Sequence, residues 1–150
     1  MRKLHSDNIV RFVDVVETEN NFYIVQEYCN GGDLRTKLNK EKQFSEKVST
    51  EYLLQLLNGF IELLTNGVIH RDMKPENILI NNKIAKIADF GFAKNVLFKS
   101  QLLKTLVGTP LYMSLQMLRN EKYTSKCDIW ALGLLYYEML YGKVPWSGKS

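Results

Sequence analysis

Two short polar segments carry side chains whose types and spacing suit the transfer of a phosphoryl group. They read His70-Arg71-Asp72-Met73-Lys74-Pro75-Glu76-Asn77 and Asp89-Phe90-Gly91. Asp89 and Asn77 offer the hard oxygen ligands that Mg²⁺ prefers. Lys74 offers a point positive charge for a transferring phosphoryl group, and Asp72 can orient an attacking hydroxyl and accept its proton.

The pattern around these segments predicts a small hairpin that brings them together. Asn77 to Ile80 and Lys83 to Ala88 read as short strands, joined at Asn81-Asn82, a pair that tolerates the left-handed backbone of a tight turn. The polar segment that begins at His70 precedes this hairpin, and the segment that ends at Gly91 follows it. We therefore expect their side chains to meet at the hairpin's open end.

Before this hairpin, the chain predicts a strand pair and two helices. Ile9 to Val16 and Phe22 to Tyr28 are rich in β-branched and aromatic residues and read as a β-hairpin. Asp33 is a candidate cap for a short helix. Ser45 is a candidate cap for a long amphipathic helix that ends at Asn66-Gly67.

After the hairpin, the chain predicts a long loop and a third helix. Residues 91–125 show no strong period, and a loop of this length within a compact domain usually carries function. Lys126 to Tyr141 is apolar on nearly all sides, which is typical of a central buried helix, and Gly142 should end it.

Composition excludes several classes of protein. A chain of 150 residues that is 45% hydrophobic and 24% charged predicts one globular domain rather than a collagen, a disordered tail or a membrane protein. The net charge of +4 is scattered, so we expect no nucleic-acid partner. Cys29 and Cys127 lack ligand spacing, and no apolar stretch suits a secretion signal or a membrane span. We expect a cytoplasmic protein with reduced thiols and no transmembrane segment.

The two polar segments together resemble the catalytic loop and metal-binding triplet of the eukaryotic protein kinases. Asn77 follows Asp72 by five residues, and Asp89 follows twelve residues later, as in that family. The resemblance implies ATP and Mg²⁺ as cofactors. It also implies Asp72, Lys74 and Asn77 as catalytic residues, with Asn77 and Asp89 holding the metal.

The resemblance covers nearly the whole chain and implies a partial bilobal α+β kinase fold. Residues 1–28 would be a remnant of the N-lobe with the start of the hinge, and residues 29–150 a portion of the mostly helical C-lobe. The implied nucleotide contacts are Glu27 and Cys29 through the hinge backbone, Asp33 near the ribose or substrate, Leu79 on the adenine floor, and Asp89. Asp128 resembles the buried aspartate that anchors the catalytic-loop backbone.

Further positions of the sequence resemble the residue pattern of the serine/threonine kinases, whose substrates are protein serine and threonine side chains. Lys74 after the catalytic aspartate and Thr109 after Gly108 follow their pattern. The strings Glu27–Leu34 and Lys86–Ala93 look most like the autophagy-initiating Unc-51-like kinases.

The resemblance also implies a regulatory site in the predicted loop. Thr105 lies where many kinases accept an activating phosphate from an upstream kinase. Arg71 and Lys94 would receive that phosphate, because charge-assisted bonds to two cations would order the loop.

The sequence departs from the family pattern in two ways. The family's Gly-rich loop, strand lysine, helix glutamate and later C-terminal helices have no counterpart in these 150 residues. Ser114-Leu115-Gln116 also stands where the family usually reads Ala-Pro-Glu. We therefore expect a kinase fragment with weak or no activity alone; the alternative is a non-catalytic, pseudokinase-like regulatory or binding module.

Overall fold

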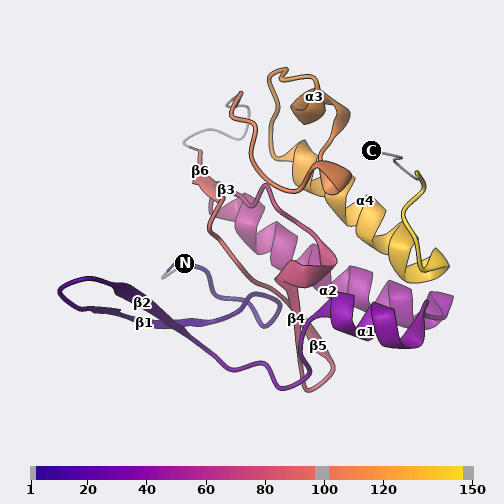
Figure 1. The fold of residues 1–150 in the computed structure, drawn as a ribbon, viewed down its shortest axis with the longest axis horizontal. Coiled ribbons are helices and arrows are strands. Elements are labelled where there is room, and N and C mark those ends of the chain that lie inside the picture. Colours follow the sequence, from indigo (N-terminus) through magenta and orange to yellow (C-terminus); the bar gives the residue numbers. More distant parts are fainter. Residues whose placement is uncertain (1–2, 97–101, 147–150) are drawn as a thin grey trace.

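The computed structural model describes residues 3–96 and 102–146, which form an α+β arrangement of small sheets and helices (Figure 1). The expected N-terminal hairpin is present: β1 (Phe12–Glu17) pairs antiparallel with β2 (Phe22–Gln26). Its first strand begins later than Ile9. Ile9 and Val10 are buried, and the Val10 amide donates to the carbonyl of Ile87 at 2.9 Å. This stretch therefore ties the hairpin to the body of the molecule.

Two capped helices follow the hairpin, as the sequence predicts. Asp33 caps α1 (Leu34–Glu41): its carboxylate accepts the amide of Thr36 at 2.8 Å. Ser45 caps α2 (Glu46–Thr65). Capping side chains satisfy amides that the first helical turn cannot pair, so both helices begin where the sequence places them.

The central hairpin consists of β4 (Ile78–Asn81) and β5 (Ile84–Ile87). The predicted position of the turn, Asn81-Asn82, is wrong by one residue. Asn81 still pairs with Ile84, and the positive φ angles fall at Asn82 (49°) and Lys83 (68°). A two-residue hairpin turn of this type needs positive φ at both central positions, and the strand pairing places them one residue later than the Asn-Asn pair suggested.

The segment expected to be a long loop contains short elements in its described part. β6 (Lys94–Asn95) pairs with β3 (Val68–Ile69), and a 3₁₀ turn at Pro110–Tyr112 precedes α3 (Leu115–Leu118). These elements are two to four residues long, too short to leave a periodic pattern in the sequence. Residues 97–101 of this loop lie outside the described residues.

The last helix, α4 (Lys126–Tyr141), ends at Gly142 in the left-handed conformation, as expected. It is not buried on all sides. Leu132, Leu135 and Met139 are in the core, whereas Trp130 is exposed on another face. No helix of the described residues is both long and apolar enough to cross a bilayer.

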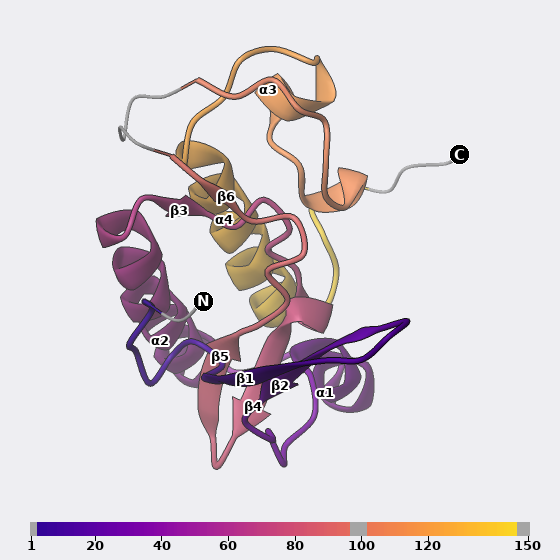
Figure 2. The ribbon, with the colours of Figure 1, turned by 90° about the vertical axis from the view of Figure 1, so that its left-hand side faces the viewer.

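The core forms where α2 packs against α4 and against β5 (Figure 2). The hairpin β4–β5 is therefore supported on one side by α2, while its open end adjoins the polar segment of residues 70–77. The core residues of this cluster include Ile9, Leu34, Leu56, Leu63, Ile78, Ile87, Leu132 and Leu135.

Candidate active site

The segment before β4 is held in place by one buried carboxylate. Asp128, at the start of α4, accepts the backbone amides of His70 and Arg71, both at 2.8 Å. The His70 ring is fully buried and contacts the carbonyl of Ala88 at 2.9 Å. Asp128 therefore anchors the loop backbone, the role that the resemblance implied for it.

Two non-glycine residues near the site have left-handed backbone conformations. These are Arg71, with φ of 71°, and Asp89, with φ of 56°. Such conformations cost about 1–3 kcal/mol each and persist where the surroundings hold them. The Asp128 hydrogen bonds supply that restraint at Arg71.

The Asp72 carboxylate lies at the centre of a polar cluster. Its Oδ1 accepts the Thr109 hydroxyl at 2.8 Å, and its Oδ2 accepts the Lys74 ammonium and the Asn77 amide, both at 2.9 Å. Lys74 also donates to the Thr109 hydroxyl at 2.9 Å. The structure thus joins three residues expected at the site with Thr109, which the sequence pattern had marked only as typical of a kinase group.

The electrostatics of this cluster keep Asp72 ionised. Burial raises the pKa of the Asp72 carboxyl, but hydrogen bonds from Lys74, Thr109 and Asn77 and the positive charge of Lys74 outweigh burial. The net pKa lies below its usual value. At neutral pH, the Asp72 carboxylate is therefore charged, and it accepts the hydrogen bond of the Thr109 hydroxyl.

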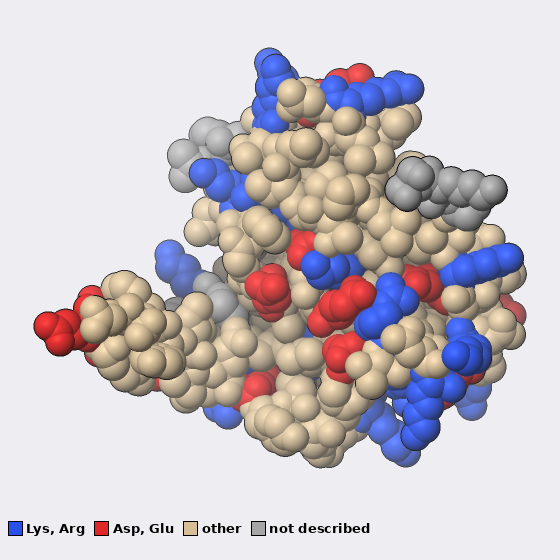
Figure 3. All heavy atoms as spheres, in the orientation of Figure 1, with Lys and Arg blue, Asp and Glu red and all other residues tan. Residues whose placement is uncertain are grey.

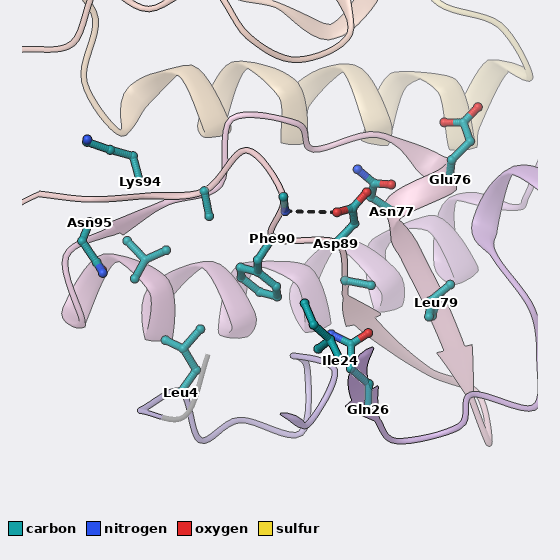
Figure 4. Close-up of a pocket in the computed structure, with 14 residues that line it drawn as sticks. Leu4, Ile24, Gln26, Glu76, Asn77, Leu79, Asp89, Phe90, Lys94 and Asn95 are labelled. Carbon is teal, nitrogen blue, oxygen red and sulfur yellow. Dashed lines mark hydrogen bonds between the residues drawn. The ribbon is translucent and has the colours of Figure 1, made fainter. Parts of the chain in front are cut away.

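Asn77 and Asp89 lie side by side at the open end of the central hairpin (Figure 4). The Ala88 amide donates to the Asn77 carbonyl at 2.9 Å, which ties the residue preceding Asp89 to Asn77. The Asn77 side-chain nitrogen donates to the carbonyl oxygen and the carboxylate of Asp72. Both of its protons are thereby used, so the Asn77 amide oxygen is left to face a cation.

The Asn77 amide oxygen and the Asp89 carboxylate suit magnesium better than they suit a metal that takes most of its ligands from side chains. Within residues 3–96 and 102–146, no group of three or more His, Cys, Asp or Glu side chains forms a metal centre. One carboxylate with one amide oxygen fits Mg²⁺, which usually keeps several waters and takes its other ligands from phosphate oxygens.

A cavity of about 640 Å³ extends from this pair toward the N-terminal hairpin. Leu79, Asn77 and Asp89 line it, together with Gln26 and Phe90 (Figure 4). Its size and its mixture of apolar walls and oxygen donors are those of a small-molecule site.

The other three residues expected to contact a nucleotide do not line this cavity. The Glu27 side chain pairs with Lys86 at 2.9 Å, and the Asp33 carboxylate caps α1. Burial raises the pKa of the Cys29 thiol, so it is a neutral group. Contacts from Glu27 and Cys29 through their backbone stay a prediction, and so does the contact from Asp33.

Two of the three residues expected to regulate the site, Thr105 and Arg71, are connected through Tyr123, whereas Lys94 lines the cavity beside Asn77 and Asp89. The Tyr123 hydroxyl donates to the Thr105 carbonyl at 2.6 Å and accepts Nη1 of Arg71 at 3.4 Å. Arg71 also donates from Nε to the carbonyl of Phe92 at 2.6 Å. Tyr123, which the sequence pattern did not single out, therefore connects the Thr105 segment to the catalytic loop.

Comparison with known proteins decides the family. The model of the protein kinase domain matches residues 1–150, the entire chain. The chain belongs to the protein kinase domain family. Its α+β fold is accordingly a part of the kinase fold, as the motifs had indicated.

The relatives of this kinase chain are serine/threonine kinases. It is 38% identical to serine/threonine-protein kinase ATG1b of Arabidopsis thaliana and to serine/threonine-protein kinase ULK1 of Homo sapiens, and 32% identical to serine/threonine-protein kinase unc-51 of Caenorhabditis elegans. Each match covers 100% of this chain but only 22%, 15% and 19% of the respective relative. The chain thus spans about a fifth of the length of these curated relatives.

Proposed function

We propose that this kinase chain serves the transfer of the γ-phosphoryl group of Mg-ATP to serine or threonine side chains of proteins. The observation that carries the proposal is the Asp72 carboxylate, bound by Lys74, Thr109 and Asn77, next to the Asn77–Asp89 pair. A proton acceptor, a fixed cation and two metal-ligand oxygens are the groups that phosphoryl transfer to a hydroxyl requires.

Each residue has a role that follows from its chemistry. Mg-ATP, when bound, supplies the electrophilic phosphorus, and Asn77 and Asp89 would hold its metal ion. Asp72 orients the acceptor hydroxyl and takes its proton as the oxygen attacks. Lys74 stabilises the negative charge on the transferring group, and its bond to Thr109 keeps its ammonium at that place.

The test is phosphate transfer from radiolabelled ATP to a serine-containing protein or peptide by a chimera of ATG1b that carries residues 1–150 in place of its own segment, because we expect the 150-residue chain alone to have weak or no activity. The chimera is compared with and without Asp72→Asn. We expect Asp72→Asn to lose at least about a hundredfold of the rate, since general-base assistance contributes roughly 10²–10⁴-fold. Lys83→Met, in the exposed turn of β4–β5, serves as the matched control and should keep the rate. Equal rates for Asp72→Asn and the wild type would remove Asp72 from the mechanism.

A non-catalytic regulatory or binding module is the second candidate function. The observation in its favour is Ser114-Leu115-Gln116, where Gln116 is neutral and exposed. Thermal stabilisation by Mg-ATP separates the two candidates: stabilisation that Asp89→Asn abolishes, without any phosphate transfer, supports the binding module. Stabilisation together with transfer supports the kinase.

We also propose that Thr105 accepts an activating phosphate from an upstream kinase and that Arg71 and Lys94 bind it. The hydrogen bonds of Tyr123 to Thr105 and Arg71 support this proposal, because they bring the Thr105 backbone close to one of the two cations.

The similarity to ATG1b, ULK1 and unc-51 supports a cytoplasmic role in starting autophagy. A chimera of ATG1b that carries residues 1–150 in place of its own segment tests that role, and loss of autophagy would count against it.

A further inference from the structure

Three exposed lysines gather where the C-terminal ends of α1 and α4 meet. Lys40 is in the last turn of α1, Lys42 follows that helix directly, and Lys143 follows the last residue of α4 by two positions. In the parts of the chain that the structure describes, none of the three forms an ion pair. Their ammonium groups are therefore free to bind a partner from solution.

Backbone contacts hold the two helix ends together. The Phe44 amide donates to the Met139 carbonyl at 2.8 Å. Gly142 has φ of 67°, and a Cβ atom built on it would collide with the Lys42 carbonyl oxygen. The residue before Lys143 thus touches the backbone of Lys42. Lysines from distant parts of the sequence are consequently neighbours in space.

The fold alone gives no reason for a lysine at position 42. Lys42 has φ of 69°, a backbone conformation that favours glycine because a Cβ atom makes it costly. The end of α4 shows the usual solution, since Gly142 takes nearly the same φ there. The Lys42 side chain is exposed and contributes nothing to the core. Its charge is the property that the fold does not explain.

The surroundings of the three lysines are positively charged. Lys37 and Glu41 of α1 neutralise each other in an ion pair of 3.0 Å. Glu46, at the start of α2, is exposed and opposes one of the three charges. Figure 3 shows several Lys and Arg side chains on the right of this face, over the ends of α1 and α4 in the view of Figure 1. An excess of positive charge at a surface attracts an acidic partner.

A hollow of about 470 Å³ lies beside these lysines. Tyr136, Leu140 and Tyr141 line it from α4, and Gln43 and Glu46 line it from the segment that joins α1 to α2. Its volume falls within the range of about 300–1,000 Å³ that is usual for binding pockets. None of its lining residues belongs to the cavity at the central hairpin. The hollow is therefore a separate place where an apolar side chain can bind.

We propose that Lys40, Lys42 and Lys143 form an exosite that binds an acidic peptide segment of a protein substrate, with an apolar side chain of that segment in the adjoining hollow. The exosite holds a part of the substrate that lies away from the phosphate acceptor. A peptide fits better than a lipid surface, because the cations surround a hollow rather than a flat face. This inference rests on the proposed function, since such an exosite presupposes a protein substrate.

The first experiment measures peptide binding to the complete 150-residue chain by fluorescence anisotropy. One labelled peptide carries several glutamates around a leucine, and its partner carries glutamine in place of each glutamate. We expect the glutamate peptide to bind about tenfold more tightly, because an exposed ion pair contributes roughly twofold and each lysine can form one. This difference should shrink as the salt concentration is raised, since salt screens exposed charges.

Two variants with the same change of net charge locate the binding site. The exosite variant combines Lys40→Gln, Lys42→Gln and Lys143→Gln, and it should bind both peptides with equal, weak affinity. The control variant changes three exposed lysines elsewhere and should keep the preference for glutamate. It also includes one lysine with φ of 68°, which matches the backbone of position 42. The control combines Lys83→Gln, Lys122→Gln and Lys126→Gln.

The second experiment measures phosphate transfer by the chimera of ATG1b that carries residues 1–150. Serine peptides are compared with and without the acidic segment, which is joined through linkers of increasing length. With one or more of these linkers, we expect the acidic segment to lower KM about tenfold and to leave kcat unchanged, because the exosite does not touch the reacting atoms. In the exosite variant of the chimera, both peptides should have the same KM and the kcat of the unaltered chimera.

The outcomes separate the exosite from the proposed function. Absence of phosphate transfer by the chimera contradicts the proposed function, whereas tighter binding of the glutamate peptide still supports the exosite. Equal Kd values of the two peptides for the wild type would overturn the exosite, and so would a glutamate preference that the exosite variant retains.

Two further probes test the nature of the partner. A glutamate peptide with serine in place of leucine should bind several times more weakly, because it loses the apolar contact in the hollow. Equal affinity of these two peptides would contradict the role of the hollow. Vesicles of phosphatidylserine and phosphatidylcholine are the second probe. If the chain binds the vesicles through the same three lysines and does not bind the glutamate peptide, the partner is a lipid surface and the proposal is wrong.

Discussion

At the scale of single residues, hydrogen bonds decide what each polar side chain of the site can do. Asn77 could present either end of its amide to a ligand, but its nitrogen is bound to Asp72 twice. Its oxygen is consequently the end available to a cation. In the same way, Lys74 and Thr109 keep Asp72 charged and aimed at one position.

The regulatory proposal is tested at this scale. Thr105→Ala removes the hydroxyl that would carry the phosphate, so we expect activation by an upstream kinase to be lost while the unphosphorylated activity stays unchanged. Lys94→Met should weaken activation severalfold, because one of two cations is gone. The measurement is the rate of peptide phosphorylation before and after treatment with the upstream kinase. Full activation of Thr105→Ala would contradict the proposal.

At the scale of elements, the loop before α3 has to approach the catalytic loop very closely. Gly108 has φ of 107°, and a Cβ atom built on it would lie 2.3 Å from the Arg71 carbonyl oxygen. Both the backbone conformation and the space exclude a side chain. This approach is what allows Thr109, the next residue, to reach Asp72.

Gly108→Ala should therefore separate the two loops. We expect a loss of about 1–3 kcal/mol in the free energy of unfolding, the usual cost of a strained backbone position. We also expect loss of the Thr109–Asp72 hydrogen bond. Urea denaturation measures the first and the NMR signals of Thr109 report the second. Gly133→Ala is the control: apart from the neighbouring backbone of its own helix, no atom lies within 4 Å of its added Cβ, and alanine in a helix should raise stability by up to about 1 kcal/mol. If the Gly108→Ala variant is as stable as the wild type and its Thr109 signals are unchanged, this account of the two loops is wrong.

At the scale of the whole molecule, the described structure has a packed body and a protruding ribbon. The body is the cluster around α2, α4 and the β4–β5 hairpin. The ribbon is β1–β2, in which Phe22 is 71% and Ile24 is 62% exposed. Figure 3 shows this ribbon extending to the left as a largely uncharged surface with acidic side chains at its tip.

This division predicts uneven protection against hydrogen exchange. A two-stranded ribbon without a covering layer is marginally stable, so its amides should open by local fluctuation. We expect the amides of β1–β2 to exchange at least about tenfold faster than those of α2 and α4. Hydrogen exchange followed by mass spectrometry measures both in one sample. Equal protection of the ribbon and the two helices would show that the ribbon is part of the same cooperative unit.

The sequence by itself determined the family and the helices α1, α2 and α4, and it predicted the residues of the candidate site. Caps such as Asp33 and Ser45 and the apolar period of α2 act locally, so the chain shows them without a structure. The spacing of Asp72, Asn77 and Asp89 also predicted that these residues lie close together, because a short hairpin returns the chain to its starting point.

Only the tertiary structure decided the contacts between distant segments. Thr109 meets Asp72 across 37 residues of chain, and Arg35 meets Glu138 across 103. The buried face of α4 and the turn at Asn82–Lys83 likewise depend on what packs or pairs with them. Such contacts depend on how separate elements pack against one another, and no local pattern of residue types records that packing.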